Sequence, residues 1–143
     1  MGPLSKTDAA RILVVEDDAS LRRLLEMRLT IDGYTARTAE DGIEALAVLE
    51  EWTPDLVVAD VMMPRLSGLS LCRAIRDSQR LAAIPVILLT ARNFDDEIEA
   101  VVRLGGITFM SKPFDAEALR SALRAALGDH AVTSARRAPE RIR

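Results

Sequence analysis

The stretch Pro54-Asp-Leu-Val-Val-Ala-Asp60 carries the pattern on which the predicted fold rests, because four consecutive apolar residues, Leu56–Ala59, end at a carboxylate. Three other short runs are almost wholly apolar and of strand length: Ile12–Val15, Val86–Leu89 and Ile107–Met110. Continuous apolar runs, in contrast to alternating ones, are typical of strands that are buried on both faces. The four runs therefore predict strands that are buried on both faces, as in a parallel sheet covered by helices.

Amphipathic helical patterns separate these runs. The clearest one extends from Leu119 to Leu127, with Asp115 as a candidate N-cap and Gly128 as a candidate stop. A fifth run, Tyr34–Thr38, is more polar and suits an edge strand. The resulting order is a strand followed by a helix, five times over. This order predicts an α/β fold in which right-handed crossovers connect the parallel strands.

The length of 143 residues and the apolar fraction of 49% predict one domain with a core of its own. We expect this domain to span residues 11–127 and to follow an N-terminal extension at 1–10. The helical period is lost after Gly128, so residues 128–143 are expected to form a mobile tail or a linker.

The composition excludes several classes of function. A net charge of −3 leaves no broad basic surface for nucleic acid. A single cysteine, Cys72, and a single histidine, His130, exclude an internal disulfide and a zinc site of paired Cys and His. No apolar run approaches the ~18 residues of a membrane span, and the N-terminus does not resemble a secretion signal. We therefore expect a cytoplasmic protein that by itself binds neither nucleic acid nor membrane.

Polar side chains follow the apolar runs, at the sheet edge where open parallel sheets bind ligands. They are Glu16, Asp17, Asp60, Thr90 and Lys112. Each of them alone is more often a helix cap or a solvated surface residue than part of a site. Their convergence on one edge, which the predicted fold requires, is a much stronger signal than any single residue.

Three close carboxylates raise one another's pKa unless a cation lies among them. Mg²⁺ suits such a site, because it takes a few carboxylates and completes its coordination with water or phosphate oxygens. Asp60 could then act as a nucleophile that becomes an acyl phosphate, while Lys112 and Thr90 supply donors. Glu16 and Asp17, which are adjacent on one loop, are better placed to hold the metal.

Four segments carry a resemblance to a known family: Ile12-Leu-Val-Val-Glu-Asp-Asp18, Pro54-Asp-Leu-Val-Val-Ala-Asp-Val-Met-Met-Pro64, Leu88-Leu-Thr-Ala91 and Ser111-Lys-Pro-Phe114. In order and spacing they resemble the receiver (CheY-like) domain of bacterial two-component response regulators, over about residues 11–127. The resemblance implies a flavodoxin-like, doubly wound fold: a five-stranded parallel sheet in the order 2-1-3-4-5, flanked by five helices.

The resemblance also implies a role for each matching residue. Asp60 matches the phospho-acceptor, Glu16 and Asp17 match the acidic pair that binds Mg²⁺, and Met62 matches the residue whose backbone carbonyl is a further ligand. Lys112 matches the lysine that contacts the phosphoryl group, and its bond to Pro113 is expected to be cis. The switch positions follow from the same match: the hydroxyl of Thr90, the small residue Ala91 beside the phosphate, and the aromatic ring of Phe109.

The function that follows is a switch in phosphorelay signal transduction. We expect Asp60 to take a phosphoryl group from a sensor histidine kinase or a phosphotransfer protein, and the change to reach a downstream protein or a fused output domain. The chain would be a stand-alone receiver or the receiver piece of a longer regulator. It would not be an enzyme beyond its own phosphorylation and dephosphorylation.

Two other classes of protein share part of this sequence pattern. A small Mg²⁺-dependent phosphatase of the haloacid dehalogenase type also uses an Asp nucleophile at a strand end, but it needs a second Asp two residues later, where Met62 stands. A nucleotide-binding module needs a glycine-rich phosphate loop, and neither G-x-G-x-x-G nor G-x-x-x-x-G-K-[ST] occurs.

Overall fold

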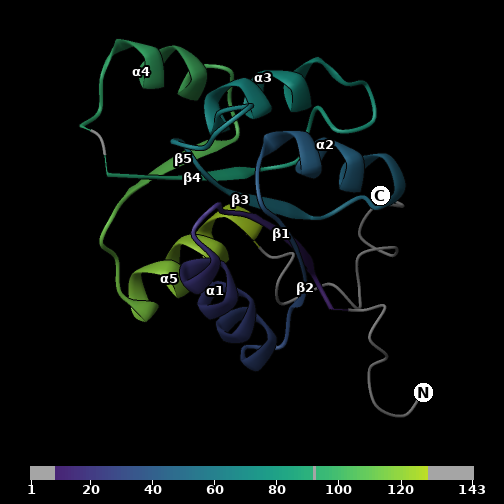
Figure 1. Ribbon diagram of the computed structural model, residues 1–143, viewed down its shortest axis with the longest axis vertical. Coiled ribbons are helices and arrows are strands. Elements are labelled where there is room, and N and C mark those ends of the chain that lie inside the picture. The colour runs from purple at the N-terminus through teal and green to yellow at the C-terminus, as the bar shows by residue number, and fades with distance from the viewer. Residues whose placement is uncertain (1–8, 92, 129–143) are drawn as a thin grey trace.

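The computed structural model describes residues 9–91 and 93–128 of the chain (Figure 1). Five strands form one parallel sheet in the order β2-β1-β3-β4-β5, which confirms the predicted topology. The strands are β1 (Arg11–Val15), β2 (Thr35–Ala39), β3 (Leu56–Asp60), β4 (Val86–Thr90) and β5 (Ile107–Ser111). His130 and nearly all of the extension at 1–10 and the tail at 128–143 lie outside the described residues.

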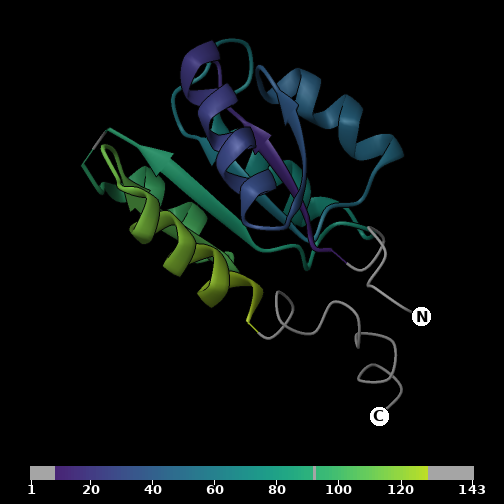
Figure 2. The same cartoon turned by 90° about the horizontal axis from the view of Figure 1, so that it is seen from below.

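Five helices cover the sheet in two layers (Figures 1 and 2). Helices α1 and α5 pack on one face, and α2, α3 and α4 pack on the other. Their bounds are α1 (Ala19–Ile31), α2 (Gly42–Glu51), α3 (Gly68–Asp77), α4 (Asp96–Val102) and α5 (Ala116–Leu127). Within the described ranges, no helix has the length and apolar composition needed to cross a membrane.

The sheet divides the apolar core into two clusters. Alternate residues of β1 point to opposite faces, so that Ile12 and Val14 join the cluster under α1 and α5, whereas Leu13 and Val15 join the other. All four side chains are fully buried. A strand buried on both faces has no polar side to expose, which is why the predicted runs were continuous. The edge strand β2 is partly exposed, as its polar sequence indicated. The other edge strand, β5, is also partly exposed, so the expectation that the apolar run Ile107–Met110 is buried on both faces was wrong.

A side chain caps the start of every helix. Asp18, Asp41, Ser67, Asp95 and Asp115 each accept a hydrogen bond from a backbone N–H in the first turn that follows. Such caps bind backbone N–H groups of the first turn that have no partner within the helix. Each cap typically stabilises its helix by about 1 kcal/mol. Because each helix follows a strand, all five caps lie near the carboxyl edge of the sheet, and they fix the loops there.

Two functional candidates lie inside strands, whereas the sequence suggested that they directly follow them. Asp60 and Thr90 are the last residues of β3 and β4 and not the first residues of the loops. Asp60 pairs with Leu89, and Thr90 pairs with Ser111. The ladder therefore holds the backbone of both residues, which makes their positions more rigid than loop positions would be.

Candidate functional site

Three carboxylates meet at the carboxyl edge of the sheet. Glu16 and Asp17 follow β1, Asp60 ends β3, and these two strands are hydrogen-bonded neighbours. Each of the three acids offers one oxygen that lies within 4.8 Å of the oxygens of the other two. Glu16 and Asp60 are buried, with 1% and 5% of their surface exposed, whereas Asp17 is open to solvent. The cluster is therefore half inside the protein and accessible from one side.

Lys112, which directly follows β5, completes the cluster at the same edge of the sheet. Its Nζ lies 3.1 Å from Oδ2 of Asp60 and 3.2 Å from Oε1 of Glu16. Its backbone N–H donates to the carbonyl of Thr90 at 2.7 Å. This bond ties the chain after β5 to the end of β4. The peptide bond between Lys112 and Pro113 is cis, as the resemblance implied.

The backbone around the acids fixes the orientation of their carboxylates. The N–H of Asp18 donates to Oε2 of Glu16 at 3.0 Å, while Arg22 donates to the backbone carbonyl of Glu16 at 2.9 Å. The N–H of Met62 donates to Oδ1 of Asp60 at 3.3 Å. Each buried carboxylate thus has one oxygen on a backbone donor and the other on Lys112.

Burial and charge act against each other in this cluster. Burial raises the pKa of Glu16, and the charge of Asp60 adds to the rise, although the N–H of Asp18 and the ammonium of Lys112 oppose it. Burial alone would lower the pKa of Lys112, but the hydrogen bonds and charges of Asp60 and Glu16 outweigh it and raise that pKa. One ammonium therefore partly balances three carboxylates, and an excess of negative charge remains.

The donor set of the cluster fits a hard divalent cation. The available ligands are carboxylate oxygens, with no sulfur or imidazole among the clustered groups. Oxygen-only sites with a few carboxylates and open positions are typical of Mg²⁺. Glu16, Asp17 and Asp60 are the residues whose oxygens would hold it.

The remaining predicted residues lie on, or directly after, strands β4 and β5. Thr90 is fully buried at the end of β4, next to β3. Ala91, which follows it, is exposed. Phe109 on β5 is partly buried and packs edge-on against Phe94, with ring centroids 5.3 Å apart and an interplanar angle of 82°. The structure thus gives Phe109 an aromatic neighbour that the sequence did not predict.

Two features near the site were missed in the sequence. A Cβ on Gly68 would lie 2.2 Å from the backbone carbonyl oxygen of Asp60, so only glycine allows α3 to start there. Arg65 has a positive φ of 69° and makes an ion pair with Asp41. A glycine in the first turn of a predicted helix was an available signal for the first feature. No sequence pattern relates Arg65 to Asp41, which lies 24 positions earlier.

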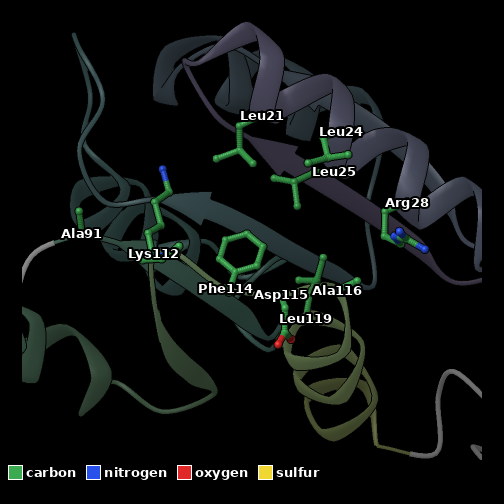
Figure 3. Close-up of a pocket in the computed structure, with 11 residues that line it drawn as sticks. Leu21, Leu24, Leu25, Arg28, Ala91, Lys112, Phe114, Asp115, Ala116 and Leu119 are labelled. Carbon is green, nitrogen blue, oxygen red and sulfur yellow. The ribbon is translucent and has the colours of Figure 1, made fainter.

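An apolar groove of about 440 Å³ runs beside the cluster, between α1 and the start of α5 (Figure 3). Lys112 and Ala91 lie at one end of it, and Arg28 lies toward the other. Leu21 and Leu24 of α1 face Phe114 across the groove.

Comparisons with known proteins agree with this geometry. The sequence profile of the response regulator receiver domain matches residues 12–124. The chain belongs to the response regulator receiver domain family. It is a receiver domain of the kind found in two-component systems, and this match favours the receiver interpretation over the phosphatase alternative.

Curated relatives are longer than this chain. The receiver domain is 42% identical over 119 residues to the response regulator MprA of Mycobacterium ulcerans (strain Agy99), an alignment that covers 83% of this chain and 50% of the relative. It is 41% identical over 119 residues to MprA of Mycobacterium bovis (strain BCG / Pasteur 1173P2), with 83% and 51% covered. The chain therefore spans about half the length of these relatives.

Solved receiver structures have the same fold. The chemotaxis protein CheY4 of Vibrio cholerae matches with a TM-score of 0.77 and 30% identity, covering 82% of this chain and 98% of that one. The receiver domain of the sensor histidine kinase PA1611 from Pseudomonas aeruginosa matches with a TM-score of 0.75 and 30% identity, covering 84% and 98%. That second structure has a magnesium ion coordinated in its active-site cleft.

Proposed function

We propose that Asp60 of this receiver domain accepts a phosphoryl group from the phosphohistidine of a sensor histidine kinase or of a phosphotransfer protein. The observation that carries the proposal is the contact of Lys112 with Asp60, 3.1 Å apart, inside a cluster with Glu16 and Asp17. A buried carboxylate next to one ammonium and two further acids suits charge-neutralised phosphoryl transfer better than it suits a structural ion pair.

The transfer requires few groups. An oxygen of the Asp60 carboxylate attacks phosphorus, the P–N bond to the donor imidazole breaks, and the ring nitrogen keeps the electron pair. Lys112, already within hydrogen-bond distance of Asp60, neutralises charge on the phosphoryl oxygens. Glu16, Asp17, Asp60 and the carbonyl of Met62 would hold Mg²⁺, which would supply further electrostatic stabilisation of those oxygens.

Phosphorylation would then act as a switch. A phosphoryl group on Asp60 offers new acceptors, which draw the hydroxyl of Thr90 and the ammonium of Lys112. Phe109 has no hydroxyl, so packing decides whether its ring turns toward the space that Thr90 leaves, with Ala91 as the small residue beside the phosphate. The change would reach the surface formed by α4, β5 and α5, and through it a downstream protein or a fused output domain.

The proposal extends to the organisation of the chain. Residues 11–127 form the switching unit, between an extension at 1–10 and a tail or linker at 128–143. The unit has no turnover of external substrates beyond its own phosphorylation and dephosphorylation. It acts in the cytoplasm and by itself binds neither nucleic acid nor membrane.

Intact-mass measurement tests the acceptor. The chain is incubated with acetyl phosphate and Mg²⁺, or with a phosphorylated histidine kinase, beside the variant Asp60→Asn. We expect a single phosphoryl adduct on the native chain, because the carboxylate is the nucleophile, and none on the variant, because its amide is not.

The same experiment separates the alternatives. An adduct that persists on Asp60→Asn would show that another residue is the acceptor. Sustained hydrolysis of a broad set of phosphate monoesters would instead support a phosphatase.

A further inference from the structure

The loop between β3 and α3 (residues 61–67) carries the backbone that lies beside Asp60, and both of its ends are fixed. The N–H of Val61 donates to Leu89 at 2.8 Å, and the N–H of Gly68 donates to Val61 at 3.0 Å. Gly68 also packs directly on the backbone of Asp60. Between these ends, Met62 is 57% exposed. The exposed side of the loop faces a cavity of about 410 Å³ that Asp17 also lines.

One ion pair fixes the middle of this loop to another element. Nε and Nη2 of Arg65 both contact Oδ2 of Asp41, at 2.9 and 2.6 Å. The side chain of Asp41 is 10% exposed, so the pair is largely shielded on the carboxylate side. The second oxygen of Asp41 caps α2 by accepting from the N–H of Glu44 at 2.9 Å. A carboxylate that is already fixed at the start of a helix is a rigid anchor for Arg65.

The ion pair holds the backbone of Arg65 in a conformation that arginine disfavours. Its φ of 69° lies in the left-handed region, which non-glycine residues rarely adopt and which is found mainly where the surroundings impose it. The next residue, Leu66, packs against Gly42, and a Cβ on Gly42 would lie 2.7 Å from the Leu66 Cβ. The close approach of the loop to α2 therefore rests on two neighbouring contacts.

We propose that the Arg65–Asp41 ion pair is a positioning device for the metal site. It holds the β3–α3 loop against α2, and so presents the backbone of Met62 beside Asp60 in the arrangement that binds Mg²⁺. Within the described residues, the side chain of Arg65 bonds to Asp41 and not to the acidic cluster, so its effect is carried by the loop. This inference rests on the proposed function, since it takes Mg²⁺ as the ligand of Glu16, Asp17 and Asp60.

The variant Arg65→Gly removes the ion pair without adding backbone strain, because glycine adopts a positive φ readily. Asp41→Asn removes the charge but keeps an oxygen for the N–H of Glu44. Mg²⁺ binding is measured by titration calorimetry on the 143-residue chain. We expect each variant to raise the dissociation constant by about tenfold, as when groups that orient metal ligands are lost elsewhere. The double variant should match the single ones, because both remove the same interaction.

Matched controls distinguish positioning from a general loss of stability. Arg124→Ala removes an arginine with the same charge from a surface pair on α5, and it should leave the dissociation constant unchanged. Urea unfolding without Mg²⁺ establishes that each variant is folded during the titration. A dissociation constant for Arg65→Gly equal to that of the native chain would overturn the proposal, and so would additive losses in the double variant.

Asp17→Asn separates this proposal from the function on which it rests. If the native chain binds Mg²⁺ and Asp17→Asn weakens binding while Arg65→Gly does not, only the positioning role fails. If the native chain shows no binding that depends on Asp17, the metal site and the positioning role fail together.

Discussion

Gly68 shows how closely a single residue can limit the site. Among the glycines of the described segments, it has the shortest distance from an added Cβ to a neighbouring atom, 2.2 Å to the carbonyl oxygen of Asp60. That neighbour is backbone inside a paired strand, so it cannot rotate away as a flexible side chain could. The position of the Asp60 backbone therefore depends on the absence of a side chain eight residues later.

Substitution Gly68→Ala should disturb the site and the fold together. The new methyl group must displace either the start of α3 or the end of β3, at about 1–3 kcal/mol of unfolding free energy, as for other overpacked sites. We expect slower phosphorylation of Asp60 by acetyl phosphate, measured by intact mass, and a lower urea midpoint.

Gly33→Ala is the matched control for that substitution. Gly33 has a positive φ of 96° but no atom within 4 Å of an added Cβ, so alanine there introduces backbone strain without a collision. It should lower stability and leave the phosphorylation rate intact. Equal rates for Gly68→Ala and the native chain would show that the contact with Asp60 does not matter.

At the scale of elements, Arg76 of α3 fixes the turn that leads into β5. Its guanidinium donates to the carbonyls of Gly105 at 2.9 Å, Gly106 at 3.1 Å and Ile84 at 2.7 Å. The glycine pair, with φ of 93° and 71°, would by itself make a loose turn. The three hydrogen bonds compensate for that freedom and connect α3 with both β4 and β5.

Substitution Arg76→Met should loosen this turn. Methionine keeps much of the apolar stem but donates no hydrogen bond, so we expect a loss of about 1–2 kcal/mol of unfolding free energy in urea. Amide exchange should also accelerate at Val86, whose N–H donates to Gly106. Arg73→Met, an exposed arginine on the same helix, is the control, and a comparable loss there would contradict the role assigned to Arg76.

At the scale of the whole molecule, the fold was predictable because its three central strands, β1, β3 and β4, are buried on both faces. Leu56–Ala59 predicted β3 to within one residue, and topology then placed Glu16, Asp60 and Lys112 at one edge. The ion pair of Arg65 with Asp41 and the edge-on packing of Phe94 against Phe109 could not be predicted. Both contacts depend on how loops pack against the finished sheet. In neither pair are the two residues related by a helical or strand period that a sequence pattern could show.

Acid unfolding of the whole chain offers a further test. Hydrogen bonds from the N–H of Glu44 and from Arg65 lower the pKa of Asp41 from its usual 3.8. A lowered folded pKa stabilises the protein above the unfolded value, and the gain is lost as pH falls through the folded pKa. The native chain should therefore exceed Asp41→Asn in stability near neutral pH, and the difference should vanish in strong acid. Urea midpoints across acidic pH measure it; a constant difference would contradict this expectation.

The direction of the elements has a practical consequence for engineering. Strand β1 begins, and α5 ends, at the sheet edge opposite the acidic cluster, because β1 runs toward that cluster and α5 runs back from it (Figure 2). At this edge the carbonyl of Ala10 accepts a hydrogen bond from the N–H of Thr35, and Leu127, the last residue of α5, is buried. A reporter protein or a surface tether joined beyond either position would therefore leave the open side of Asp17 and Asp60 accessible to a phosphodonor.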